Sequence, residues 1–419
     1  MSDTGPLPEK VRSLNVSVGG VGSGQLLRHS VYEYRYATPE ADQPSVALQM
    51  PARQPTWQAG DLFPSMDQNL PEGDLFMRLR AMFPKQSLTP MHLLALGGQN
   101  GIGRLGFTLQ NRPAPGAGRV IDKATLLATR YSPSVFDELV AAYLSTGAGI
   151  AGMQPKIMVP DRPTVPVPSL IVKAASETYP GLAANEFLCL SAAKRAGILT
   201  PTFALSDDGQ MLVLDRFDLV DAGEGKTRRL GFEDVAALGG LRVRDTLADR
   251  KYHGSYQQVA ELLRKFMLHS DDLHRFFEQV AFSVMVRNGD AHLKNFGLLY
   301  SSEKDLRLAP MFDVVTTAVY RYTQYAGGPE LEDRTLALKL FSGKHGSKVY
   351  PTTEALLDFG RRVCGVQQPQ RVIGRIAQAM AETLESTRGD ARVPGTLRND
   401  MRVLWEDGMA HDRVAANPG

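Results

Sequence analysis

The sequence is poor in cysteine and nearly neutral in charge. Cys189 and Cys364 are its two cysteines among 419 residues, which argues for a reducing compartment and against a disulfide framework or a zinc site. The net charge of +2 excludes a broad electrostatic footprint for DNA or for an anionic membrane. No run approaches the ~18–20 apolar residues of a membrane span, and residues 1–10 lack an apolar signal core. These absences predict a cytoplasmic location without a membrane contact.

The remaining composition is that of an ordinary globular protein. Hydrophobic residues make up 43% and charged residues 22% of the chain, and its length predicts two or three domains. Residues 1–12 are polar and are expected to be disordered. Residues 13–148 are predicted to form a mixed unit with a turn at Gly19-Gly20. Its predicted strands cover residues 14–18, 25–28, 31–36 and 45–49, and its predicted helices cover residues 73–83, 90–96 and 133–144.

Two glycine-rich segments fit the G-x-G-x-x-G pattern of phosphate-binding loops. Residues 101–106 follow a predicted helix and precede a strand, so this segment lacks the strand-first order of such a loop and is not expected to bind phosphate. Residues 147–152 enter a strand over residues 157–159, and their backbone N–H groups are expected to approach phosphate closely. The second segment is therefore the predicted phosphate loop.

The strand that follows decides between two kinds of nucleotide site. A dinucleotide-binding loop is followed about 20 residues later by an acid that binds ribose. Here the strand over residues 170–173 ends in Lys173, at the place where a kinase carries the lysine that pairs the α- and β-phosphates. The charge of this residue favours a kinase.

Two further elements continue the kinase order. Glu186, near the start of a predicted helix over residues 184–196, is the candidate ion-pair partner of Lys173. The alternative is a solvated glutamate that the helix dipole favours in the first turn. The apolar run over residues 211–214 leads into Arg216-Phe217-Asp218, the position of the hinge that meets adenine, and Asp218 is the candidate for the ribose hydroxyls.

The stretch Asn288–Phe296 carries the predicted chemistry. Asp290 is followed five positions later by Asn295, and two short apolar runs separate both from Asp313. In a kinase the first acid accepts the substrate hydroxyl proton, and the asparagine and second acid hold magnesium. Such residues are also common in turns, because Asx side chains bond their own backbone. Six parts therefore occur in kinase order: the glycine loop, Lys173, Glu186, the hinge, Asp290 with Asn295, and Asp313. Their complete order, rather than any one part, indicates phosphoryl transfer.

These motifs resemble the HipA family of bacterial Ser/Thr protein kinase toxins, whose fold lies near the phosphoinositide-kinase-like branch. The core D-[AG]-H-x-K-N-F of that family fits residues 290–296 at all seven positions. The resemblance covers nearly the whole chain and implies an α+β, two-lobed kinase-like fold. Its predicted parts are an N-terminal subdomain over residues 13–148, a nucleotide lobe over 149–220 and a helical lobe over 221–419. The other segments that carry it are Ala151–Lys156, Asn185–Cys189, Arg216–Asp218 and Leu308–Asp313.

The resemblance implies a role for each matching position. Asp290 would be the catalytic base, Asn295 and Asp313 the magnesium ligands, and His292 and Lys294 would touch phosphates or the transferred group. The alternative for His292 is a hydrogen-bonded turn histidine. The implied nucleotide-binding residues are Ile150, Ala151, Gly152, Lys156, Lys173, Glu186, Arg216, Phe217 and Asp218.

One position departs from the family pattern. Relatives often carry an autophosphorylated serine where this chain has Gly149. Ser145 and Thr146, a few residues earlier, are the candidate replacements. Regulation by phosphorylation of this loop is therefore an open prediction.

The resemblance also implies partners and a biological role. The cofactors would be ATP and Mg²⁺, and the partner a dimeric HipB-like helix-turn-helix antitoxin through which the chain reaches operator DNA. Relatives arrest growth by phosphorylating a protein substrate, an aminoacyl-tRNA synthetase, at serine. Two alternatives stay open: a pseudokinase that acts only as a corepressor, and a kinase for a lipid or small-molecule hydroxyl.

Overall fold

The computed structural model describes residues 7–38, 43–110, 120–146, 156–159, 168–174, 178–224, 226–266, 269–323, 328–344 and 346–416. The chain divides into two compact units that are interleaved along the sequence. The first unit contains Met1–Ala174, Val213–Leu247 and Leu298–Leu306, and the second contains Ala175–Leu212, Ala248–Gly297 and Arg307–Gly419. Neither unit is a continuous stretch of chain.

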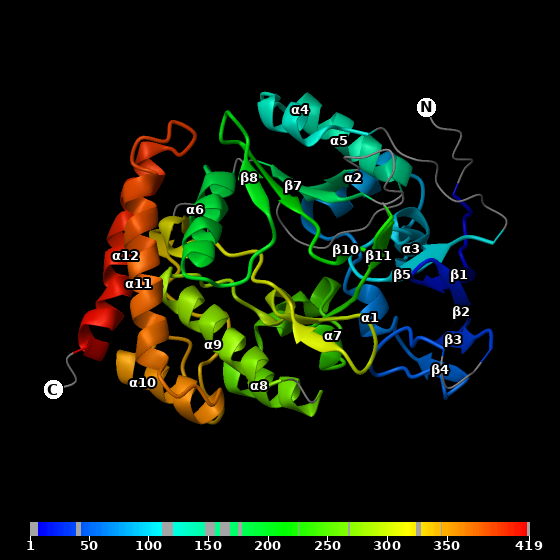
Figure 1. The fold of residues 1–419 in the computed structure, drawn as a ribbon. Coiled ribbons are helices and arrows are strands. Elements are labelled where there is room, and N and C mark those ends of the chain that lie inside the picture. Colours follow the sequence, from blue (N-terminus) through cyan, green and yellow to red (C-terminus); the bar gives the residue numbers. More distant parts are fainter. Residues whose placement is uncertain are drawn as a thin grey trace. The chain divides into compact units, whose positions relative to one another are not determined.

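An antiparallel five-stranded sheet forms the N-terminal part of the first unit (Figure 1). Gly19 and Gly20 have φ angles of 59° and 87°, which glycine adopts readily and which the tight turn between the first two strands requires. The predicted hairpin and third strand are confirmed. The strands, in the sheet order β4-β3-β2-β1-β5, are β4 (Thr56–Ala59), β3 (Tyr32–Tyr36), β2 (Val21–Arg28), β1 (Ser13–Val18) and β5 (Leu105–Thr108).

The predicted strand over residues 45–49 is wrong. Only an isolated bridge between Ala47 and Met50 forms there. The backbone groups bond side chains instead of a neighbouring strand: the N–H of Val46 donates to the Tyr36 hydroxyl and the N–H of Leu48 to the Glu233 carboxylate. Side-chain acceptors from other segments therefore take the place of a sheet ladder here.

The helices of the first unit follow the predicted pattern. Thr89 is the N-cap of α3, and its backbone N–H donates to Nδ1 of His92. Leu7 and Val11 are buried, so the expected disorder does not hold for residues 7–12. The helices are α1 (Pro64–Asp67), α2 (Gly73–Met82), α3 (Pro90–Gly97), α4 (Lys123–Ala128), α5 (Pro133–Thr146) and α7 (Val235–Leu238).

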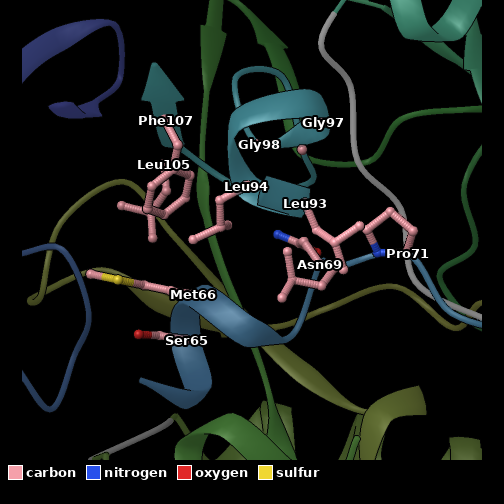
Figure 2. A pocket seen from close by; sticks show the side chains of 12 residues that line it. Ser65, Met66, Asn69, Pro71, Leu93, Leu94, Gly97, Gly98, Leu105 and Phe107 are labelled. Atoms are coloured by element: carbon pink, nitrogen blue, oxygen red, sulfur yellow. The ribbon is translucent and has the colours of Figure 1, made fainter. Parts of the chain in front are cut away.

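A small cavity lies among α1, α3 and β5 (Figure 2). Met66 and Leu94 line it together with Leu105 and Phe107, so its wall is largely apolar. None of the predicted catalytic or nucleotide-binding residues lines it. We regard this cavity as part of the packing of the N-terminal subdomain.

Short strands build the remaining sheets. Ile157, Met158 and Val159 have no exposed surface, as expected for a strand covered on both faces. One sheet has the order β6-β7-β9-β8 and another β12-β13-β14, and β10-β11 and β15-β16 are two-stranded ribbons. The strands are β6 (Lys156–Val159), β7 (Leu170–Ala174), β8 (Phe203–Leu205), β9 (Met211–Asp215), β10 (Leu219–Asp221), β11 (Thr227–Arg229), β12 (Gly231–Asp234), β13 (Gly297–Tyr300), β14 (Leu306–Leu308), β15 (Arg321–Thr323) and β16 (Glu330–Glu332).

The second unit is mainly helical, with α11 and α12 side by side (Figure 1). A Cβ atom at Gly408 of α12 would lie 1.9 Å from the Met285 carbonyl oxygen of α9, so glycine permits this close helix contact. Within the described part of the chain, no helix combines the length and apolar character needed to cross a membrane. The helices are α6 (Leu182–Arg195), α8 (Tyr256–Lys265), α9 (Ser270–Met285), α10 (Thr353–Asp358), α11 (Pro369–Ser386) and α12 (Gly395–Ala416), with the shorter turns η1 (Asp245–Tyr252), η2 (Leu293–Asn295), η3 (Thr317–Val319) and η4 (Phe359–Val363).

A buried carboxyl group lies in the first unit at Glu233. Its Oε1 accepts hydrogen bonds from the Tyr300 hydroxyl at 2.6 Å and from the Leu48 N–H at 2.8 Å. Burial raises the pKa of Glu233 to about 7, against the opposing effects of these bonds and of Arg104. The folded chain therefore binds more protons than the unfolded chain between the unfolded pKa and about pH 7. Stability should fall as pH rises through that range.

We expect Glu233→Gln to remove this pH dependence, because glutamine keeps the accepting oxygen but does not ionise. At about pH 8 the variant should be more stable than the wild type by roughly 1–3 kcal/mol, and at about pH 5 the two should be alike. Urea unfolding at both pH values measures this, with the exposed Glu224→Gln as control. The prediction would be contradicted if the free energies of unfolding of variant and wild type differed by the same amount at both pH values.

Candidate functional site

A tight turn presents Asp290 after the end of α9. The Asn288 side chain accepts the Asp290 N–H at 3.0 Å, and the Gly289 N–H donates to the Thr317 hydroxyl at 2.7 Å. A Cβ atom at Gly289 would lie 2.6 Å from the Thr335 carbonyl oxygen, so a larger residue would displace the turn. The Asx bond of the simple turn interpretation is thus present, and it leaves the Asp290 side chain 50% exposed.

Tyr252, at the end of η1, holds the Asp290 carboxylate. Its hydroxyl donates to Oδ1 of Asp290 at 2.7 Å, and its ring meets the His292 ring edge-on at 5.2 Å. Burial, and then the Asp290 charge, raise the pKa of Tyr252 far above its ordinary value. The phenol is therefore a permanent donor that fixes one oxygen of Asp290. Sequence analysis did not find Tyr252, because no motif marks it.

His292 is buried beside Asp290, with Nε2 3.9 Å from Oδ1 of the carboxylate. Burial, followed by the charges of Lys251 and Lys294, lowers the pKa of His292 well below its ordinary value, although Asp313 opposes this. The imidazole is therefore neutral near pH 7. Its backbone N–H bonds Oδ1 of Asn295 at 3.1 Å, whereas Nδ1 has no hydrogen-bond partner among the described residues. The turn uses the backbone of His292 and not its ring.

The two predicted magnesium ligands lie in the second unit with Asp290. Asn295 is buried and its Oδ1 accepts one bond, from the His292 N–H, which leaves its second lone pair for another partner. Asp313 has a φ of 55°, a left-handed conformation that is uncommon for a residue other than glycine and that clusters at functional sites. Its charge acts on His292, which places it near the turn.

The chain after Asp313 is anchored by buried side chains. The Asn185 side chain of α6 accepts the Thr316 N–H at 2.8 Å and donates to the Thr316 carbonyl at 3.0 Å. Nε1 of Trp405 donates to the Thr316 hydroxyl at 2.8 Å. Two helices distant in sequence, α6 and α12, therefore hold the chain that follows Asp313. Sequence analysis assigned no role to Thr316 or Trp405.

The oxygen atoms of Asn295 and Asp313 fit magnesium. Among the residues that the structure describes, no group of three or more His, Cys, Asp or Glu side chains could hold a metal ion. Magnesium does not need one, since proteins commonly bind it through one or two carboxylates together with substrate phosphates. An amide oxygen and a carboxylate are hard ligands of the required kind.

Two lysines face each other in the first unit. Lys156 of β6 is the cross-strand partner of Lys173 of β7, so both side chains lie on the same face of the ribbon. Both are buried. Like charges directly opposite destabilise a strand pair, and an anion such as a polyphosphate would offset this.

Glu186, in α6 of the second unit, has no exposed surface. This excludes the solvated first-turn glutamate that was the alternative. A fully buried carboxylate is costly without compensation, so its burial is consistent with an ion pair. The identity of that pair stays a prediction.

Arg216 and Asp218 have a different role from the one predicted. Their side chains are wholly buried and form an ion pair at 2.7 Å. The Arg216 guanidinium also donates to the carbonyls of Asn100, Gly101 and Pro168, and Asp218 accepts the Gly103 N–H at 2.7 Å. These bonds occupy all the donors of Arg216. The predicted contact of Asp218 with ribose is therefore wrong, and the pair instead holds the glycine-rich loop over residues 99–103.

The remaining members of the predicted site are Phe217 and the residues of the phosphate loop and its flank. Phe217 is half-buried, and its ring lies edge-on to Phe232 at 5.3 Å. Ser145 and Thr146 end α5, but their side chains lie outside the described structure, as do Ile150, Ala151 and Gly152. The phosphate loop and its autophosphorylation therefore stay predictions.

Two domain families match this sequence. The family described as the HipA-like C-terminal domain matches residues 148–387, more than half of the chain, and the HipA N-terminal domain matches residues 14–108. The chain belongs to the HipA family. The C-terminal match contains Lys156, Lys173, Asp290, Asn295 and Asp313, and the N-terminal match contains the five-stranded sheet.

Relatives of this HipA family member include two proteins with kinase names. "Putative kinase Y4dM" of Sinorhizobium fredii is 30% identical over 167 residues, which cover 36% of this chain and 38% of that protein. "Putative kinase" of Haemophilus influenzae is 28% identical over 223 residues, which cover 48% and 60%. The chain thus matches only about two fifths to three fifths of the length of these curated relatives.

A solved structure shows the fold of the HipA family member. It is a chain in the Shewanella oneidensis MR-1 complex of the toxin–antitoxin system HipA, HipB and its operator DNA, with a TM-score of 0.63 and 16% identity over 96% of each chain. The likeness confirms the predicted α+β HipA-like kinase fold, with an antiparallel N-terminal sheet and a helical C-terminal region.

We expect Asp218→Asn to unfold more easily than the wild type by about 3–5 kcal/mol, because it leaves the buried Arg216 guanidinium without its counter-charge. ATP affinity of the folded variant should be unchanged, since Asp218 is not exposed. Urea unfolding and ATP titration measure the two effects, with the exposed Asp221→Asn as control. A stable variant with weakened ATP binding would restore the ribose role.

Proposed function

We propose that this HipA family member is an ATP-dependent Ser/Thr protein kinase. One observation carries the proposal: the half-exposed Asp290 carboxylate is fixed by Tyr252, in the unit that also holds Asn295 and Asp313. A phosphoryl-transfer site needs a positioned base, metal ligands and a cationic clamp, and little covalent chemistry. The paired Lys156 and Lys173 supply the clamp.

Each residue of the proposed site has its own role in phosphoryl transfer. Asp290 accepts the proton of the acceptor hydroxyl as that oxygen attacks the γ-phosphorus of ATP, and ADP leaves with the electrons of the broken P–O bond. Tyr252 keeps the carboxylate oriented, and Lys173 and Lys156 bind nucleotide phosphates. Magnesium, held by Asn295 and Asp313, would neutralise charge on the phosphates.

The wider role is a toxin in a toxin–antitoxin pair. Family membership and the likeness to the HipA–HipB–operator complex support a HipB-like helix-turn-helix partner that brings operator DNA. The substrate would be a protein whose phosphorylation stops growth, such as an aminoacyl-tRNA synthetase. A corepressor without kinase activity is less well supported, because Lys173, Asp290, Asn295 and Asp313 are all present.

We expect Asp290→Asn to reduce phosphoryl transfer by about 10²–10⁴-fold, the usual contribution of a general base. The half-exposed side chain contributes little to packing, so the melting temperature should be nearly unchanged. Transfer from labelled ATP to proteins of a cell extract, followed by phosphosite mapping, measures the effect. Asp271→Asn, the same change at an exposed residue in the first turn of α9, serves as the control.

Two outcomes of this experiment would contradict the proposal. Equal labelling by wild type and Asp290→Asn would remove Asp290 as the base. ATP binding without any labelled protein would favour the corepressor or a small-molecule acceptor.

We expect Asp313→Ala to weaken ATP binding by at least about tenfold with magnesium present, because it removes a charged ligand of the metal. ATP binding in EDTA should be the same for variant and wild type. Titration of ATP with and without magnesium separates the two. Equal magnesium dependence in both proteins would argue against Asp313 as a ligand.

A further inference from the structure

Two lysines lie beside Tyr252 in the second unit, and a third lies near one of them. Nζ of Lys251 lies 5.2 Å and Nζ of Lys348 5.9 Å from the centre of the Tyr252 ring, and Lys348 also donates to the Tyr252 carbonyl at 2.9 Å. Lys339 lies close enough for its charge to act on Lys348. We call Lys251, Lys339 and Lys348 the lysine cluster.

Backbone contacts hold the lysine cluster in place. The Lys339 carbonyl accepts the Tyr256 N–H at 2.9 Å, and the Lys348 carbonyl accepts the Leu336 N–H at 2.6 Å. Thr335 and Val349 form an antiparallel bridge that closes the segment carrying both lysines. The backbone that carries Lys339 and Lys348 is therefore fixed, and the Lys348 ammonium is held by the Tyr252 carbonyl.

The lysine cluster lacks a bound counter-charge. All three side chains are half-buried, and none forms an ion pair with a carboxylate in the described part of the chain. The neighbouring acid Glu332 is already paired with Arg334. Burial and the charge of Lys339 lower the pKa of Lys348, although Asp333 opposes this. Half-buried cations with no carboxylate partner create a local field that attracts anions.

The lysine cluster lies where an acceptor would approach. An acceptor hydroxyl must come within about 2.6–3.2 Å of the base, and Tyr252 joins the lysine cluster to Asp290. In an extended peptide, residues two or three positions from the acceptor lie roughly 7–10 Å from it. Those residues would pass over Tyr252 and its lysines.

We infer that the lysine cluster selects protein substrates with an anionic side chain, either acidic or phosphorylated, two or three residues from the acceptor hydroxyl. This inference rests on the proposed kinase function and names its substrate class. A compact anion suits lysines that are gathered beside one tyrosine, and binding of RNA is an outcome that the test distinguishes.

The test uses two fluorescent peptides that each contain one serine, followed by three glutamates in one and three glutamines in the other. With the full chain at low salt, we expect the wild type to bind the glutamate peptide about tenfold more tightly and to phosphorylate it faster. In Lys339→Gln/Lys348→Gln, and separately in Lys251→Gln, the glutamate peptide should bind like the glutamine peptide. The exposed Lys344→Gln is the matched control and should keep the preference.

The outcomes separate this inference from the kinase proposal. Equal affinity and equal phosphorylation of both peptides would overturn the inference and leave the kinase proposal standing. Loss of ATP affinity in the double variant would also overturn it, because the lysines would then serve the nucleotide. Tighter binding of an eight-nucleotide oligouridylate than of the glutamate peptide would overturn the inference and show that the lysine cluster binds RNA. Selective peptide binding with no phosphate transfer by the wild type would support the anion site and count against the kinase.

Discussion

The buried ion pair of Arg216 and Asp218 is the constraint on which the first unit depends. It joins the end of β9 to the loop over residues 99–103 through carbonyl and N–H bonds. Arg229 adds four bonds to the carbonyls of Gln99, Gly101, Gly103 and Leu105. A buried guanidinium needs an acceptor for each of its N–H groups. The desolvation cost of an unpaired N–H group is larger than the net stabilisation from one hydrogen bond. The loop that leads into β5 of the N-terminal sheet is thus joined by hydrogen bonds to the segment that follows β9.

In the second unit, Asp290 has a comparable dependence on its neighbours. Its rotamer rests on Tyr252, its backbone on Asn288, and the later Asp313 segment on Asn185 and Trp405. A reacting group must be held closely for catalysis, and buried supporting side chains are what hold it. The half-exposed Asp290 carboxylate is therefore accessible, whereas the supporting side chains hold its position.

Sequence analysis could identify what is local in the chain, namely short motifs and short-range periodicity. The order of Lys173, Glu186, Asp290, Asn295 and Asp313 could be seen because each motif is local in the chain. The hairpin at Gly19-Gly20 and the long helices followed from short-range periodicity for the same reason.

The errors have a common physical cause in long-range contacts. Asp218 looked like a ribose ligand because its partner Gly103 lies 115 residues away in the sequence. Tyr252 carries no motif, and its bond to Asp290 spans 38 residues. Residues 45–49 were predicted to form a strand, yet side chains from other segments accept the N–H groups of Val46 and Leu48.

The interleaving of the two units has a consequence for synthesis on the ribosome. The first unit includes residues 298–306, so it cannot close until about three quarters of the chain has been translated. The second unit needs the C-terminal helices as well. Early termination of translation releases a chain in which neither unit is complete. We expect such a chain to be degraded by proteases.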